Sequence, residues 1–134
     1  MWEDLPNTVY FDLLHRFKDR VVIELAGHDH FASLRSHEAT DGSFYHNIFV
    51  APSITPWYSN NPGVSSFRIE KRDADGDWVP LGLRSTFLNL NATIGLEAPL
   101  PLDQLDFREL DFEKDFGLVD MSASSIATLA ERLS

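Results

Sequence analysis

The chain has 134 residues, of which 43% are hydrophobic and 24% charged, and this composition indicates one globular domain. A formal net charge of −10 argues against a protein that binds nucleic acid polymers or anionic membranes through a basic surface. No apolar run approaches the roughly 20 residues that a membrane-spanning helix needs. The sequence contains no cysteine, which excludes disulfides within these residues and leaves the cellular compartment undecided.

The first elements predicted are an amphipathic helix and an apolar strand. Asn7 can cap a helix over residues 8–19. One face of this helix is apolar, with Val9, Tyr10, Leu13, Leu14 and Phe17. The strand over residues 21–26 is apolar on both faces and therefore expects neighbours on both sides. Glu24 is the exception in this strand, and it should lie at a sheet edge or pair with a cation.

Two histidines follow this strand in the sequence Gly27-His28-Asp29-His30. In an extended chain His28 and His30 would point the same way, because the side-chain period of a strand is two. Imidazole is the commonest protein ligand for zinc, so the pair would supply half of a metal site. An isolated His-x-His is more often a hydrated surface pair, and the surrounding sequence has to decide between the two interpretations.

The next segment is predicted to be a β-hairpin followed by a rigid loop. Strands over residues 31–37 and 44–50 flank a Thr-Asp-Gly-Ser turn. His37 and His46 lie on this hairpin and are more typical of structural residues than of ligands. Residues 51–63 hold three prolines together with Trp57 and Tyr58. This loop is either the wall of a substrate cleft or a crossover whose aromatic side chains fill a small core of their own.

The second half of the chain is predicted to begin with strands and to end in helices. Strands are expected over residues 64–71, 78–81 and 84–91. The acidic run over residues 73–77 is a hairpin turn rather than an EF-hand loop, which would need a glutamate where Gly82 stands. A helix is expected over residues 102–116, ended by Gly117. A last helix opens at Ser122, with Ile126, Leu129 and Leu133 at helical spacing.

Several blocks of this sequence occur in the same order in one known family. The Gly-His-x-His motif resembles the last metal-binding motif of the calcineurin-like metallophosphoesterases. The other blocks are a tryptophan-led segment with an amphipathic helix within residues 2–20, Phe-Val-Ala-Pro-Ser-Ile-Thr-Pro at 49–56, Asn-Pro-Gly at 61–63, and a closing segment at 112–122. Together they are similar to one branch of that family, the acid sphingomyelinase-like phosphodiesterases.

The resemblance implies a fold and a metal site. The fold would be α/β: the C-terminal portion of a metallophosphoesterase-type two-sheet sandwich with flanking helices, over residues 1–100, and a C-terminal helical extension over residues 101–134. In the family two divalent metal ions, commonly zinc, polarise the phosphoryl group and lower the pKa of a bridging water. His28 and His30 would each bind a different ion of the pair. Tyr58 and Asn61, from the cleft wall, would contact the substrate.

The other metal-binding motifs of the family are absent from this sequence. These are an Asp-x-His, a Gly-Asp-x-x-Asp, a Gly-Asn-His-Asp or -Glu, and a lone histidine. Two imidazoles cannot hold two metal ions, since each ion needs at least three or four ligands. We therefore expect the chain to be the C-terminal part of a metal-dependent phosphodiesterase, inactive on its own. Its partners would be the N-terminal part of the same enzyme and a phosphodiester substrate of the lipid or nucleotide type.

A second function is compatible with the same sequence, and one short motif bears on the cellular location. The chain could be a catalytically inactive module of a metallophosphoesterase-like scaffold, with a structural or binding role in an extracellular assembly. Asn91-Ala92-Thr93 is an acceptor sequon for N-glycosylation, although such tripeptides are common by chance. The expected location is secreted, or the lumen of lysosomes or other endomembranes. Residues 1–20 lack the pattern of a signal peptide, so a secretion signal is expected outside this sequence.

Overall fold

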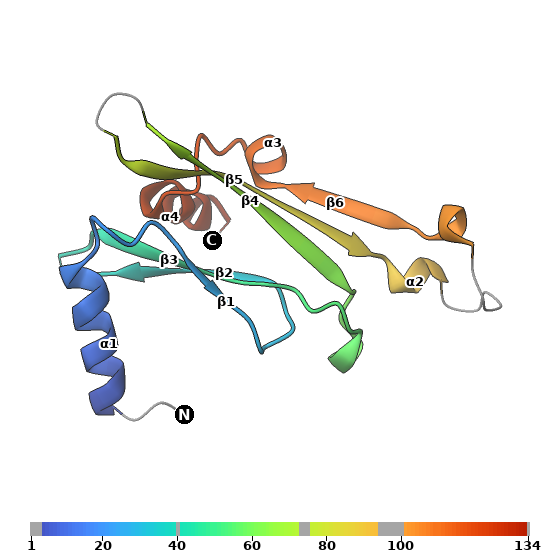
Figure 1. Ribbon diagram of the computed structural model, residues 1–134, viewed down its shortest axis with the longest axis horizontal. Helices are drawn as coiled ribbons and strands as arrows, with labels where there is room; N and C mark the ends of the chain where they lie inside the picture. The colour runs from blue at the N-terminus through green and yellow to red at the C-terminus, as the bar shows by residue number, and fades with distance from the viewer. Residues whose placement is uncertain (1–3, 40, 73–75, 94–100, 134) are drawn as a thin grey trace.

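The computed structural model describes residues 4–39, 41–72, 76–93 and 101–133, and within them the fold is mixed α/β (Figure 1). The helices are α1 (Asp4–Arg16), α2 (Leu90–Thr93), α3 (Phe112–Phe116) and α4 (Ala123–Leu133). The strands are β1 (Glu24–Ala26), β2 (Ser33–Glu38), β3 (Phe44–Val50), β4 (Gly63–Lys71), β5 (Trp78–Leu88) and β6 (Phe107–Asp111). Short 3₁₀ turns stand at Trp57–Ser59 and Leu102–Gln104.

The first sheet contains the predicted hairpin and the strand that precedes the two histidines. Its order is β1-β3-β2, with β2 antiparallel to β3 and β1 parallel to β3. The hairpin is therefore confirmed, with His37 opposite His46. Among the described residues β1 pairs on one side alone, so it forms an edge of this sheet. The edge position of Glu24 agrees with the prediction for this residue.

The second sheet is antiparallel, with the order β4-β5-β6. The prediction of two strands over 78–81 and 84–91 is wrong, because β5 runs without a break from Trp78 to Leu88. Its register shifts where Arg68 faces Gly82 and Ile69 faces Pro80. A bulge of this kind admits a proline and a glycine inside a strand, which is why these residues do not end it.

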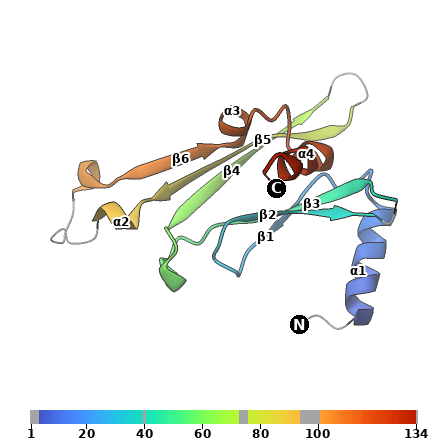
Figure 2. The same ribbon diagram turned by 180° about the vertical axis from the view of Figure 1, so that it is seen from behind.

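The core lies between the two sheets and α4. Phe49 of β3 and Phe67 of β4 meet edge to face with ring centroids 4.9 Å apart, which joins the sheets directly. The buried cluster is Phe49, Leu83, Leu118, Met121, Ile126 and Leu129. Ile126 and Leu129 confirm the apolar face predicted for the final helix, whereas Leu133, predicted on the same face, is 70% exposed. Figures 1 and 2 show α1 beside the first sheet, at the opposite end of the molecule from α2.

Helix α1 begins and ends earlier than predicted. It runs from Asp4 to Arg16, so Asn7 lies inside the helix and the prediction of Asn7 as its cap is wrong. The predicted apolar face also divides into two parts. Leu14 is buried, whereas Val9, Leu13 and Phe17 are 46–49% exposed and form a second apolar stripe at a spacing of four residues.

The helix predicted over residues 102–116 is wrong for most of its length. This segment forms a 3₁₀ turn, then β6, and then the single turn of α3. Strand β6 forms because β5 offers a free edge, on which residues 107–111 pair with residues 84–88. The predicted stop at Gly117 is confirmed, since this residue has a left-handed backbone (φ 66°) directly after α3.

Two sequence predictions meet the limits of the described residues. The acidic turn is described at Gly76 and Asp77 alone, because residues 73–75 lie outside the described part. The proposed division at residue 100 also falls next to an undescribed stretch. Asn91 lies exposed on α2, as an acceptor for glycosylation would have to. None of the helices in the described part is both long and apolar enough to cross a membrane.

Candidate metal-binding loop

The two histidines lie in a bend that begins where β1 ends. Strand β1 stops at Ala26, and both His28 (φ 83°) and His30 (φ 64°) adopt the left-handed backbone conformation. The segment is therefore not an extended strand, and the strand period gives no reason for the two side chains to point the same way. Left-handed backbone costs a residue with a side chain about 1 kcal/mol or more, and such conformations cluster at functional sites.

The loop is held to the proline-rich segment through the backbone of His30. The carbonyl oxygen of His30 accepts a hydrogen bond from the backbone N–H of Ser53 at 3.2 Å and another from Nδ2 of Asn60. The backbone N–H of Ala51 donates to the carbonyl of Ala26 at 2.8 Å, which closes the start of the loop. Asn60 was not predicted as a site residue, and its place beside the Asn-Pro-Gly block was the signal for it in the sequence.

Three buried polar atoms near this loop have no hydrogen-bond partner among the described residues. They are Nδ1 of His30, Oγ of Ser33 and Oδ1 of Asn60. Buried polar atoms are nearly always paired, so unpaired ones in one place call for a ligand or a further part of the protein. An imidazole nitrogen is a good zinc ligand, so the unpaired Nδ1 of His30 is an atom that fits a metal ion.

The described residues do not form a complete metal site. They contain no group of three or more histidine, cysteine, aspartate and glutamate side chains placed to hold a metal ion. Asp29, between the two histidines, forms an ion pair with Arg35 at 3.0 Å on the surface. The side chain of His28 is exposed, whereas that of His30 is half-buried. At most, then, this loop supplies part of a ligand set.

The aromatic side chains of the proline-rich loop lie near the candidate metal loop. The rings of Tyr58 and His30 are 6.3 Å apart between centroids, and Trp57 packs edge to face on Tyr58. Tyr58 is 71% and Trp57 is 63% exposed, so neither fills a small core. The crossover alternative is therefore wrong for these two residues. Oδ1 of Asn61 accepts a hydrogen bond from the backbone N–H of Leu90 at 3.0 Å, and its contact with a substrate stays a prediction.

A second histidine cluster lies on the face of the first sheet that α1 covers. His46 is 2% exposed, and its Nε2 lies 3.3 Å from Oε2 of Glu24, which also accepts a hydrogen bond from the hydroxyl of Tyr10. The ring of His37 is stacked on that of His46, at 6.2 Å between centroids. Burial, followed by the nearby His46, lowers the pKa of His37 below its usual value.

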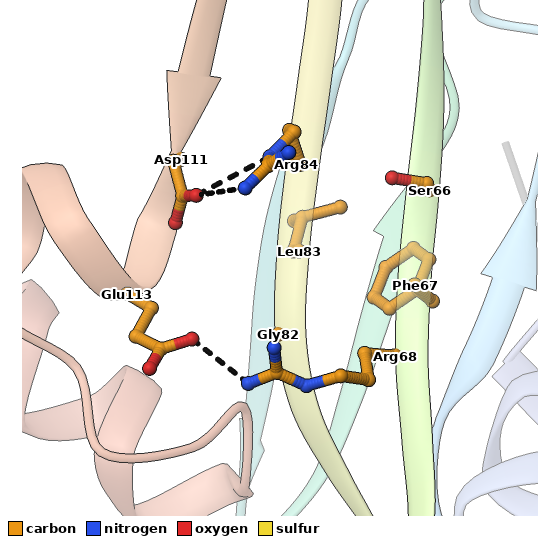
Figure 3. Close-up of a pocket in the computed structure, with 8 residues that line it drawn as sticks. All are labelled: Ser66, Phe67, Arg68, Gly82, Leu83, Arg84, Asp111 and Glu113. Atoms are coloured by element: carbon orange, nitrogen blue, oxygen red, sulfur yellow. Dashed lines mark hydrogen bonds and ion pairs between the residues drawn. The ribbon is translucent and has the colours of Figure 1, made fainter.

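A shallow pocket on the outer face of the second sheet is lined by two arginines, Arg68 and Arg84 (Figure 3). Both are engaged by carboxylates: Arg68 pairs with Glu113 at 2.9 Å and Arg84 with Asp111 at 2.8 Å. The first pair joins α3 to β4, and the second joins β6 to β5. They also neutralise the positive charge, so the pocket is no obvious site for an anion.

Comparison with known proteins bears on the chain as a whole. No protein-family model matches it. It is 28% identical over 133 residues to the cyclic GMP-AMP phosphodiesterase SMPDL3A of Rattus norvegicus, and 26% identical over 132 residues to that of Homo sapiens. The chain resembles the acid sphingomyelinase-like phosphodiesterases. These matches cover 95% and 94% of the chain but 28% and 27% of the relatives, so the chain spans little more than a quarter of their length.

Proposed function

We propose that this chain is the C-terminal segment of a metal-dependent phosphodiesterase, to which it contributes His28 and His30 as metal ligands. The observation that carries the proposal is the similarity of nearly the whole chain to proteins named as cyclic GMP-AMP phosphodiesterases. The unpaired Nδ1 of His30 beside the motif is consistent with it.

The metal would be a pair of divalent ions, with zinc the first choice for imidazole ligands. When bound, such ions polarise a phosphoryl group and lower the pKa of a bound water. His28 and His30 would hold one ion each. The remaining ligands would come from the N-terminal part of the same enzyme, because the described residues offer no third ligand. The two sheets would then be the C-terminal portion of the two-sheet sandwich, with residues 101–134 as an extension that also adds β6 to the second sheet.

The proposed substrate is a phosphodiester, and the nucleotide type is favoured over the lipid type. The relatives' name specifies a cyclic dinucleotide, and the exposed rings of Trp57 and Tyr58 beside His30 suit the flat face of a base. Tyr58 and Asn61 remain the residues proposed to contact it. A secreted or lumenal location and glycosylation of Asn91 belong to the same proposal, and they rest on the sequon and on its exposed asparagine.

The experiment uses the natural full-length protein with a nucleotide phosphodiester and a sphingomyelin-type phosphodiester as separate substrates. We expect turnover of the nucleotide substrate, loss of that turnover with a chelator and recovery with added zinc. The alternative, an inactive structural or binding module, predicts no turnover of either substrate by a folded, zinc-supplemented protein. That result would overturn the enzymatic proposal.

A further inference from the structure

The carboxylate of Glu24 connects three elements: its own strand β1, the central strand β3 and helix α1. Oε2 of Glu24 accepts the hydroxyl hydrogen of Tyr10 from α1 and lies 3.3 Å from Nε2 of His46 in β3. The side chain of His46 is 1% exposed and that of Glu24 is 33% exposed. The carboxylate is thus fixed from two sides, by a helix and by the central strand.

Stability alone does not explain this carboxylate. Removing a carboxylate from water is costly, and the side chain of Glu24 is 33% exposed, so much of it is withdrawn from solvent. Apolar residues of similar volume often serve a fold as well as a buried polar group or better. The neighbouring positions of the same segment, Val22, Ile23 and Leu25, are apolar. A group that makes directional bonds can instead specify one arrangement among several, which is the best-attested use of buried polar groups.

The register of strand β1 against β3 is one arrangement that needs such a directional contact. Strand β1 has three residues, it lies at an edge among the described residues, and it pairs with β3 in the parallel sense, which is the weaker one. A slip by one residue would move Glu24 to the other face of the sheet, away from Tyr10 and His46. The two contacts of Glu24 therefore fix where β1 stands against β3.

The register of β1 determines where the candidate metal loop begins. Ala26, two residues after Glu24, is the last residue of the strand, and the strained residues His28 and His30 follow at once. The far side of the loop is fixed by the hydrogen bonds to the carbonyl of His30. The near side is held by the hydrogen bond from Ala51 to the carbonyl of Ala26 and by strand β1, in which Glu24 is the side chain with directional partners.

We propose that Glu24 is a positioning residue for the metal-binding loop, held in place by Tyr10 and His46. The proposal rests on the proposed function, because it assigns Glu24 a role through His28 and His30. Outer residues that orient metal ligands typically change metal affinity about 10- to 100-fold when they are replaced.

The test compares Glu24→Leu, Glu24→Gln and Glu38→Leu in the natural full-length protein. Glu24→Leu removes the directional contacts, whereas Glu24→Gln keeps a group that can accept from Tyr10. Glu38→Leu removes a similar charge from the exposed face of β2 in the same sheet. Zinc affinity is measured by competition with a coloured chelator, well below the unfolding temperature of every variant. Circular dichroism verifies that each variant is folded.

We expect Glu24→Leu to weaken zinc binding about tenfold or more, with Glu24→Gln and Glu38→Leu close to the original protein. A folded Glu24→Leu variant with unchanged zinc affinity would overturn the positioning role. An equal loss in Glu24→Leu and Glu38→Leu would overturn it too, because the effect would then follow charge and not geometry. If His28→Ala and His30→Ala themselves leave zinc affinity unchanged, it is the proposed function that fails.

Discussion

At the scale of single residues, the candidate site combines a predicted feature with several unpredicted ones. The Gly-His-x-His motif, together with the other blocks shared with the family, selected His28 and His30 as the candidate ligands. It could not reveal that both have left-handed backbone, because a strand-to-loop boundary leaves the dihedral angles of the loop undetermined. The role of Asn60 depends on a contact across 30 residues of sequence, which no local pattern encodes.

His37 should make the fold sensitive to acid. Its pKa is lowered from 6.5, first by burial and then by His46; Glu24 opposes this shift, and Arg35 adds a smaller lowering. The unfolded chain therefore takes up this proton at a higher pH than the folded chain does. The contribution of His37 to the stability of the fold is fully present above the pKa of this histidine in the unfolded chain, about 6.5. It is lost as the pH falls from there through the lower pKa of the folded chain.

Replacing His37 removes this pH-dependent contribution to the stability of the fold. We expect His37→Gln to lose less stability than the original protein when the pH is lowered from neutral through 6.5, the usual histidine value. The measurement is the unfolding midpoint as a function of pH. His15→Gln, on the exposed face of α1, controls for the loss of an imidazole. Parallel pH profiles for His37→Gln and the original protein would contradict the assignment.

Among the secondary-structure elements, those with a local sequence signal were predicted, whereas β6, which depends on a neighbouring strand, was not. Strand β5 was predicted as two separate strands. The hairpin of β2 and β3 is framed by a turn sequence, and α4 has a regular apolar spacing, so both could be read locally. Strand β6 exists because β5 presents an edge to it. Its own residues, 107–111, lie in a charged stretch with helix formers, and tertiary pairing overrides that preference.

Gly63 shows how closely β4 approaches its surroundings at the end of the proline-rich loop. A Cβ at this position would lie 3.1 Å from the carbonyl oxygen of Thr86 and 3.3 Å from the Cβ atoms of Phe87 and Pro52. These atoms belong to backbone or to rigid positions and cannot easily move. We expect Gly63→Ala to destabilise the fold by about 1–3 kcal/mol, measured by thermal or denaturant unfolding.

Gly27 provides the matched control for this substitution. A Cβ on Gly27 would have no neighbour within 4 Å, and its φ is not in the left-handed region. Gly27→Ala should therefore change stability by less than about 0.5 kcal/mol. Equal effects of the two substitutions would show that the close packing of Gly63 is not a determinant of stability.

At the scale of the whole molecule, apolar surface remains exposed around the first sheet. Leu25 on the edge strand β1 is 60% exposed, and the stripe of Val9, Leu13 and Phe17 lies on the outside of α1. An open edge next to apolar side chains favours association. The net charge of −10 slows aggregation but does not cover this apolar surface.

We therefore expect these 134 residues, expressed alone, to be poorly soluble or oligomeric, to bind zinc weakly and to hydrolyse no generic phosphodiester. Size-exclusion chromatography with light scattering, followed by zinc titration, measures the first two properties. A single monomeric species that melts cooperatively and binds zinc tightly would show that the chain is a self-sufficient domain.

The proposed role of His28 and His30 as metal ligands is tested most directly by the zinc content of the purified full-length protein. Elemental analysis by mass spectrometry compares the original protein with His28→Ala, His30→Ala and the exposed control His15→Ala. We predict that each of the first two variants loses zinc and most phosphodiesterase activity, while the control retains both. Unchanged zinc content in both loop variants would show that His28 and His30 are not zinc ligands.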